Sequence, residues 1–196
     1  MRNRMNSDLG FYEKQLTTTK VFDGVLLHVY QDTVLLPSGN RSIREYIKHP
    51  GAAVVIPHLG NQQILLIRQY RYPIRQIVLE LPAGKIDPGE SPEMTIQREL
   101  AEETGYQAHW LKPVAPIHTC VGYSDEIINL YWADQLTPAS LPPDADEFIE
   151  TISYSISAAM SLVYNGQITD AKTLIGLFWA DRILNNPQLA RKYLPA

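Results

Sequence analysis

The sequence has little cysteine, no long apolar run and no excess of positive charge. Cys120 is the only cysteine among 196 residues, which excludes the disulfide framework that small secreted domains use. No stretch approaches the roughly 18 consecutive apolar residues that a membrane-spanning helix requires. No apolar run follows the basic residues near the N-terminus, so we expect no secretory signal, a cytoplasmic location and no membrane partner.

The charge balance is mildly acidic, with a formal net charge of -4 and a pI near 5.7. Binding to nucleic acid without sequence preference requires a concentrated basic surface, which this composition does not supply. We therefore expect no nucleic-acid partner, and an anionic substrate would need local cations or a metal ion. The five histidines are scattered, and no two lie at metal-ligand spacing.

Turn-forming residues divide the first half of the chain into short extended segments. Segments 25–35 and 43–47 flank a Pro-Ser-Gly-Asn turn at residues 37–40, which predicts a β-hairpin. Further strands are predicted at residues 52–56, 63–68 and 77–81. We place a domain boundary after this hairpin, with residues 1–49 as an N-terminal extension and residues 50–196 as the main domain.

One central helix is predicted from Ser91 to Thr104. Serine followed by proline favours a helix start, and Gly105 favours its end. Strands are predicted after it at residues 114–119, 127–133 and 148–155, and helices over residues 156–184. This order of elements indicates an α+β domain, with most strands around one helix and further helices at the C-terminus.

Three glutamates lie close together on the predicted helix. Glu102 and Glu103 follow Glu99 by three and four residues, so all three fall within about 100° of one face. Arg98 can pair with Glu102, which leaves Glu99 and Glu103 to point outward together as oxygen ligands for magnesium or manganese. The alternative reading is a solvated acidic helix face without a ligand.

Glycine and proline-rich turns precede this helix, and together they complete a longer pattern. Its fixed positions are Gly84, Glu90, Arg98, Glu99, Glu102, Glu103 and Gly105. This pattern resembles the Nudix box, although Tyr106 stands where the box usually has an aliphatic residue, a difference that we attribute to packing. The resemblance implies a Nudix α/β/α sandwich with a mixed sheet, preceded here by the β-hairpin extension.

The resemblance also implies roles for the residues of the box. Glu99, Glu103 and often Glu102 bind the metal ions, and the backbone carbonyl of Ala83 completes the coordination. Arg98 makes an orienting salt bridge, so Arg98 and Glu102 count as catalytic residues.

Segments outside the box resemble the ADP-ribose pyrophosphatase branch of this family. They are the Arg44-Glu45 pair and residues 68–71, 122–126 and 168–173. This branch implies magnesium-dependent hydrolysis of ADP-ribose to AMP and ribose 5-phosphate. It also implies a homodimer whose N-terminal extension lies at the interface, with Arg44, Glu45 and Arg71 in contact with the substrate.

The general base is expected in an acidic loop between the late strands. Asp144, Asp146 and Glu147 are the candidates, and Glu147 is preferred because it adjoins the next strand; a solvated acidic turn is the alternative. A proline common beyond the box in ADP-ribose hydrolases is absent from residues 119–122. A nucleotide sugar such as GDP-mannose, or a dinucleotide, therefore remains an alternative substrate, and a non-catalytic Nudix-like ligand-binding domain is the alternative outside enzymes.

Overall fold

Residues 10–139 and 148–195 are described by the structure, a computed structural model, and they fall into two units. One unit holds the residues up to His49 together with Cys120–Glu126. The other holds Pro50–Thr119 and the residues from Ile127 onward. Within the described residues, no helix combines the length and the apolar character needed to cross a membrane.

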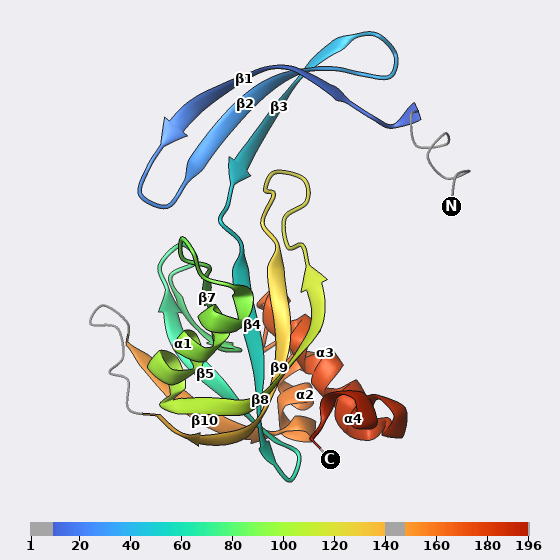
Figure 1. The fold of residues 1–196 in the computed structure, drawn as a ribbon. Coiled ribbons are helices and arrows are strands. Elements are labelled where there is room, and N and C mark those ends of the chain that lie inside the picture. The colour runs from blue at the N-terminus through green and yellow to red at the C-terminus, as the bar shows by residue number, and fades with distance from the viewer. Residues whose placement is uncertain (1–9, 140–147, 196) are drawn as a thin grey trace. The chain divides into compact units, whose positions relative to one another are not determined.

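The N-terminal unit is built on a three-stranded antiparallel sheet (Figure 1). Its strands are β1 (Lys14–Asp23), β2 (His28–Leu35) and β3 (Arg41–Lys48). The predicted hairpin corresponds to β2 and β3, and Gly39 in their turn has a φ of 85°. The sequence did not indicate β1, because all ten of its residues are exposed and its threonine-rich stretch has no apolar alternation.

A distant segment joins this small sheet. The amide of Ile47 donates to the carbonyl of Tyr123 at 2.8 Å, and the amide of His49 donates to Oδ1 of Asp125 at 2.8 Å. These bonds attach Cys120–Glu126 to the end of β3, a contact across more than 70 residues that local sequence patterns do not reveal.

The larger unit contains a mixed sheet of seven strands. The strands are β4 (Ala52–Gly60), β5 (Gln63–Arg71), β6 (Gln76–Glu80), β7 (Ala83–Lys85), β8 (Tyr106–Ile117), β9 (Ile128–Pro138) and β10 (Ile149–Ser155). Their order is β10-β5-β4-β9-β8, with β6 paired to β5 and β7 paired to β4. The pair β4 and β9 is parallel, whereas the other pairs are antiparallel.

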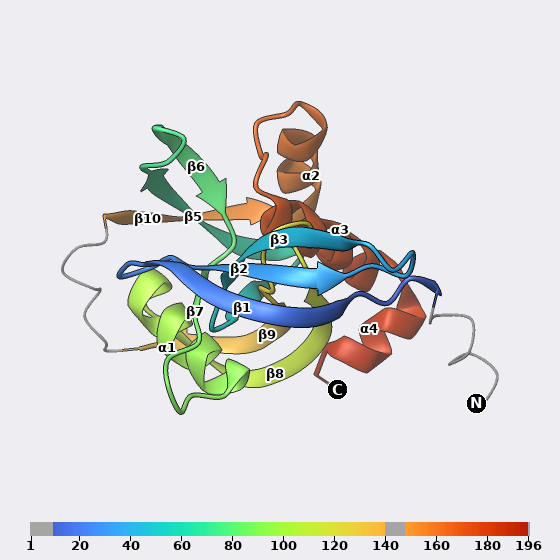
Figure 2. The same ribbon diagram turned by 90° about the horizontal axis from the view of Figure 1, so that it is seen from above.

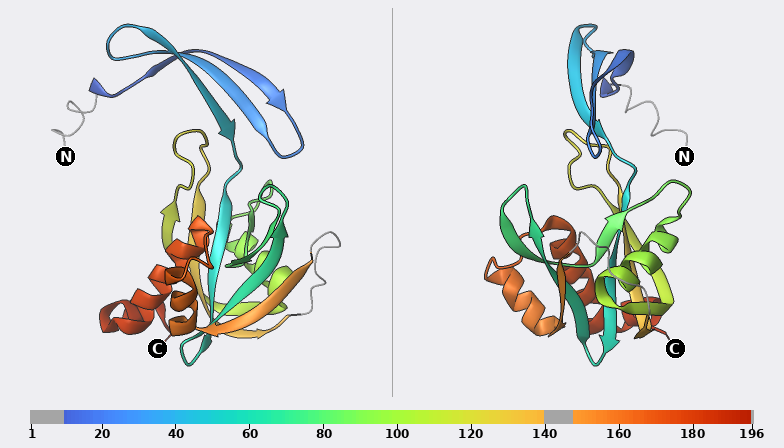
Figure 3. Two further views of the ribbon diagram at one scale, coloured as in Figure 1. Left: turned by 180° about the vertical axis from the view of Figure 1, so that it is seen from behind. Right: turned by 90° about the vertical axis from the view of Figure 1, so that its left-hand side faces the viewer.

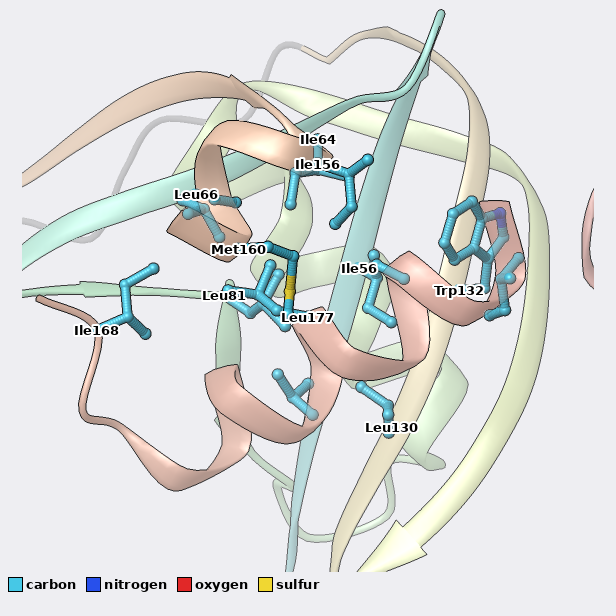
Figure 4. Packing of buried hydrophobic residues seen from close by; sticks show 14 of the residues in the cluster. Ile56, Ile64, Leu66, Leu81, Leu130, Trp132, Ile156, Met160, Ile168 and Leu177 are labelled. Carbon is cyan, nitrogen blue, oxygen red and sulfur yellow. The ribbon is translucent and has the colours of Figure 1, made fainter. Parts of the chain in front are cut away.

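Helices cover both faces of this sheet (Figures 2 and 3). One face carries α1 (Pro92–Thr104), and the other carries α2 (Ile156–Tyr164), α3 (Ala171–Asn185) and α4 (Pro187–Tyr193). The alternation of β4 explains both layers, because successive side chains of a strand point to opposite faces. Val55 packs with Leu100 of α1, whereas Ile56 packs with Leu177 of α3 (Figure 4). The predicted α+β sandwich with a mixed sheet is therefore confirmed.

Element boundaries differ from the prediction in places where the local pattern is weak. Strand β8 begins at Tyr106, immediately after α1, and Tyr106 packs against the same core cluster as the helix. Strand β7 has only three residues and carried no detectable periodicity. Helix α4 follows α3 at once, since Asn186 caps it and Pro187 occupies its first turn.

Candidate active site

Helix α1 presents the box glutamates, and its ends are fixed by local chemistry. The side chain of Ser91 accepts a hydrogen bond from the amide of Met94 at 3.2 Å, which satisfies one amide of the first turn. Gly105 ends the helix in the left-handed conformation, with a φ of 72° and its amide bonded to the carbonyl of Ala101. The helix therefore starts and stops where the sequence predicted.

The carboxylates of Glu99 and Glu103 are buried against the strand that precedes the helix. Glu99 is 9% exposed and Glu103 is 6% exposed, and Oε2 of Glu103 accepts from the amide of Ala83 at 3.0 Å. A Cβ on Gly84 would lie 1.6 Å from Oε1 of Glu99, so glycine leaves the space that this carboxylate fills. The expectation that both glutamates point outward was wrong, because β7 packs alongside them.

Arg98 connects the acidic groups at the start of the box. Its guanidinium donates to Glu90 at 3.0 Å, to Glu99 at 2.9 Å and to Glu102 at 3.0 Å. The expected pair with Glu102 is thus one contact of a larger network. The hydrogen bond to Glu90 raises the pKa of Arg98 most strongly. The same hydrogen bond, with help from Thr95, lowers the pKa of Glu90 to about 2.

This donor set fits a hard divalent cation that retains water ligands. Nη1 of Arg98 donates to both Glu99 and Glu102, so these two carboxylates converge on one positive charge. No group of three carboxylate, histidine or cysteine side chains at metal-binding distances was found in the part of the chain that the structure describes. Magnesium is commonly held by one or two carboxylates plus water, so this arrangement suits it, with the backbone carbonyl of Ala83 as a further candidate ligand.

Arg71 belongs to a second charged cluster in the same unit. Its Nε and Nη2 donate to the two oxygens of Glu80, at 2.7 and 2.9 Å. Glu80 is 2% exposed and also accepts from Lys172, whose ammonium reaches Asp170 at 3.1 Å. Arg71 was expected from the sequence, whereas Glu80 and Lys172 were not. A charged residue at the end of the apolar segment 77–81 was the available signal for Glu80.

Arg44 and Glu45 lie on β3 in the N-terminal unit and point to opposite faces of that strand. Arg44 donates to Glu13 through two nitrogens at 2.6 and 2.8 Å, whereas Glu45 accepts from Gln31 at 3.1 Å. The structure therefore does not bring these two candidate substrate ligands onto one surface of the sheet.

The candidate general bases Asp144, Asp146 and Glu147 lie outside the described residues. Their assignment stays a prediction.

Comparison with known proteins is consistent with this geometry. A family model described as the NUDIX domain matches residues 48–174. The chain is similar to an ADP-ribose pyrophosphatase of Bacillus subtilis, with 37% identity over 163 residues that cover 82% of this chain and 88% of the relative. It is equally similar to a methanol dehydrogenase activator of Bacillus methanolicus, with 37% identity over 169 residues, or 85% of this chain and 91% of the relative.

Two further similarities are more distant. A GDP-mannose pyrophosphatase of Yersinia enterocolitica is 31% identical over 166 residues, which cover 79% of this chain and 86% of the relative. A crystal structure of an ADP compounds hydrolase superposes with a TM-score of 0.81 at 25% identity, over 90% of this chain and 95% of that one.

Proposed function

The chain belongs to the NUDIX domain family, and from this premise we propose that it hydrolyses ADP-ribose to AMP and ribose 5-phosphate. The observation that carries the proposal is the packing of Glu99 and Glu103 against the glycine-containing strand β7, with Arg98 linking the neighbouring carboxylates. A solvated acidic helix face would not require a glycine to admit a buried carboxylate.

In the proposed reaction a water oxygen forms a new bond to one phosphorus atom of the diphosphate. The bond from that phosphorus to the bridging oxygen breaks, its electron pair stays with the departing phosphate, and the proton of the water passes to a base. We propose Glu147 as this base, ahead of Asp144 and Asp146. Magnesium, or manganese in its place, supplies positive charge to the diphosphate oxygens and acidifies the water when it is bound.

The remaining site residues are proposed to hold the cation and to orient the groups around it. We propose that Glu99, Glu102, Glu103 and the carbonyl of Ala83 hold the cation, while Arg98 keeps Glu99 and Glu102 converged. Arg71 has one guanidinium edge on Glu80, and its side chain is 40% exposed, so it can still donate to a phosphate oxygen.

Arg44 and Glu45 are proposed to contact the substrate from the N-terminal extension. Because their side chains lie on opposite faces of β3, the two residues would reach the substrate from different sides of the strand.

We also propose that the enzyme is a cytoplasmic homodimer in which the extension, residues 1–49, lies at the interface and residues 50–196 form the catalytic domain. The support is the exposure of apolar side chains in the N-terminal unit: Phe22 on β1 is 55% exposed, Ile43 on β3 is 59% exposed, and Leu26, between β1 and β2, is 54% exposed. Apolar patches of this kind often mark a protein interface.

The first experiment tests the metal face. Replacing Glu103 by Gln keeps an oxygen that can accept from the amide of Ala83 but removes the charge. We expect turnover to fall by several orders of magnitude with the fold intact by circular dichroism. Glu93→Gln, on the exposed first turn of the same helix, is the matched control and should retain activity. Near-normal turnover in Glu103→Gln would remove Glu103 from the metal site.

The second experiment tests the substrate. The similarity to a GDP-mannose pyrophosphatase favours a nucleotide sugar as the second candidate. ADP-ribose, GDP-mannose and a dinucleotide are compared at equal concentration with magnesium, and the released phosphomonoester is measured. The highest kcat/KM is expected with ADP-ribose. A preference for GDP-mannose would refute this choice, and binding of ADP-ribose without any product would identify a non-catalytic ligand-binding domain.

A further inference from the structure

Glu80 carries a buried negative charge that two cations share. Its side chain is 2% exposed and accepts hydrogen bonds from Arg71 on β5 and from Lys172 on α3. Burial raises the pKa of Glu80, but the hydrogen bond from Arg71 and the charge of Lys172 outweigh it, so the pKa lies below its ordinary value. A buried carboxylate without such partners is strongly destabilising, so the three side chains form one unit.

The orientation of Arg71 follows from these contacts. Nε and Nη2 are fixed by the two oxygens of Glu80, so Nη1 is the guanidinium nitrogen that this pair does not occupy. The pKa of the Arg71 guanidinium is raised, chiefly by its hydrogen bond to Glu80, with a smaller contribution from the charge of Glu103. Glu80, which holds one edge of this partly exposed arginine, lies three residues before Ala83, whose amide donates to Glu103 of the proposed metal face.

Lys172 determines how much of the positive charge of Arg71 remains for a ligand. Arg71 and Lys172 bring two positive charges to Glu80 and Asp170, which bring two negative charges. Without the charge of Lys172, the single positive charge of Arg71 would remain against the two carboxylates, and the cluster would become net negative. An anionic diphosphate would then meet a weaker donor and a more negative surface.

The place of Lys172 is itself fixed by the start of α3. Asp170 caps this helix by accepting from the amide of Thr173 at 3.0 Å, and it also accepts from Lys172. The hydroxyl of Thr173 accepts from the amide of Leu81 at 2.9 Å, so the first turn of α3 is bonded directly to the segment that follows Glu80.

We propose that Lys172 is a positioning residue that acts through Glu80 to present Arg71 to the diphosphate of the substrate. This inference rests on the proposed function, because it assigns a diphosphate to the open edge of Arg71. A purely structural ion-pair network, which would only attach α3 to the sheet, is the competing explanation.

A double-mutant cycle separates the two explanations. Lys172→Met is measured in the wild type and in Arg71→Lys, which keeps one positive charge beside buried Glu80 but lacks the second guanidinium edge, and kcat and KM are determined for the preferred nucleoside diphosphate. In the wild type we expect kcat/KM to fall by on the order of 10-fold or more, mainly through KM, as for loss of a charged hydrogen bond. In the Arg71→Lys protein the same change should cost less than about 2-fold, because the guanidinium edge through which Lys172 acts is missing while Glu80 keeps a cation.

Two further variants serve as controls for the charge of Lys172 and for the loss of a lysine elsewhere. Lys172→Arg keeps the positive charge and should retain most of the wild-type kcat/KM. This variant can still be measured if Lys172→Met folds poorly. Lys192→Met is the control, since Lys192 is exposed on α4 and its ammonium contacts the hydroxyl of Tyr193 rather than a carboxylate. Equal losses for Lys172→Met in the wild type and in Arg71→Lys, or wild-type kcat/KM in Lys172→Met, would overturn the proposal.

A measurement that does not require turnover distinguishes failure of the positioning role of Lys172 from failure of the proposed function. If the wild type hydrolyses none of the nucleotides, the proposed function is wrong. The Nε–H resonance of Arg71, assigned by its loss in Arg71→Lys, still reports the positioning. It should shift in Lys172→Met while the resonance of Arg68, which pairs with exposed Glu150, stays unchanged. An unmoved Arg71 resonance would overturn the positioning role.

Discussion

Gly84→Ala tests the active site by adding a single methyl group, from which we expect a large fall in kcat. A methyl group at this position would lie 1.6 Å from Oε1, 2.0 Å from Cδ and 2.7 Å from Cγ of Glu99. Ordinary contact starts near 3.4 Å, so the carboxylate oxygen has to retreat by roughly 1.8 Å. A misplacement of about 1 Å in a catalytic group can cost on the order of 100-fold in rate, so we expect kcat to fall at least that far.

The fold should survive this substitution. Gly84 is not among the glycines with positive φ, so alanine can adopt its backbone conformation. The atoms that must move belong to the end of one side chain rather than to backbone. We therefore expect a melting temperature close to that of the wild type, together with a higher magnesium concentration at half-maximal rate. Gly10→Ala is the control, since nothing lies within 4 Å of the added methyl group.

The assay is the magnesium-dependent release of phosphomonoester, with kcat measured at saturating substrate and metal. Glu99→Gln and the double variant complete the test. If Gly84→Ala acts only by displacing Glu99, the double variant should be no slower than the slower single variant. A Gly84→Ala protein with kcat within about 3-fold of the wild type at saturating magnesium would refute the argument, because the displaced carboxylate could not then be a required ligand.

Three other predictions concern stability, pH and assembly. Gly176→Ala places a methyl group 2.2 Å from Cδ1 of buried Leu81, so the free energy of unfolding in urea should fall by about 1–3 kcal/mol, and an unchanged value would contradict this packing. The lowered pKa of Glu90 means that its stabilising contribution is present above the ordinary value of 4.5 and is lost as the pH falls toward about 2. The difference in melting temperature between wild type and Glu90→Gln should therefore shrink from pH 6 to pH 3, and a constant difference would argue against the network. Phe22→Asp, on the exposed small sheet, should shift the protein from dimer to monomer in light scattering, whereas a monomeric wild type would refute the dimer.

The sequence could predict α1 accurately because the signals at both of its ends are local. A serine cap, a proline in the first turn and a glycine in the left-handed region each act within a few residues. The same holds for the turn that joins β2 and β3, where Gly39 has a positive φ. The spacing of the glutamates likewise follows from helix periodicity alone, so their convergence was predictable.

The direction in which the glutamates point was not predictable, because it depends on a second element. Strand β7 has only three residues, yet it covers Glu99 and Glu103 and reverses the expectation that they face outward. The pairing of Glu80 with Lys172 joins residues 92 positions apart, beyond the reach of any periodic pattern. The opposite directions of Arg44 and Glu45, by contrast, follow from strand alternation and could have been derived from the sequence.

Residues 80–84 connect the two helical layers of the larger unit. On the side of α3, Glu80 receives Lys172 and the amide of Leu81 donates to Thr173. On the side of α1, the amide of Ala83 donates to Glu103, and Gly84, which has no side chain, leaves room for the carboxylate of Glu99. Glu80 and Leu81 are therefore held by side chains of α3, whereas Ala83 and Gly84 lie against side chains of α1. Residues 80–84 therefore link the glutamates of α1 to the cations around Glu80. We infer that the geometry of the proposed metal face depends on the start of α3. This part of the chain lies outside the motif that identifies the family.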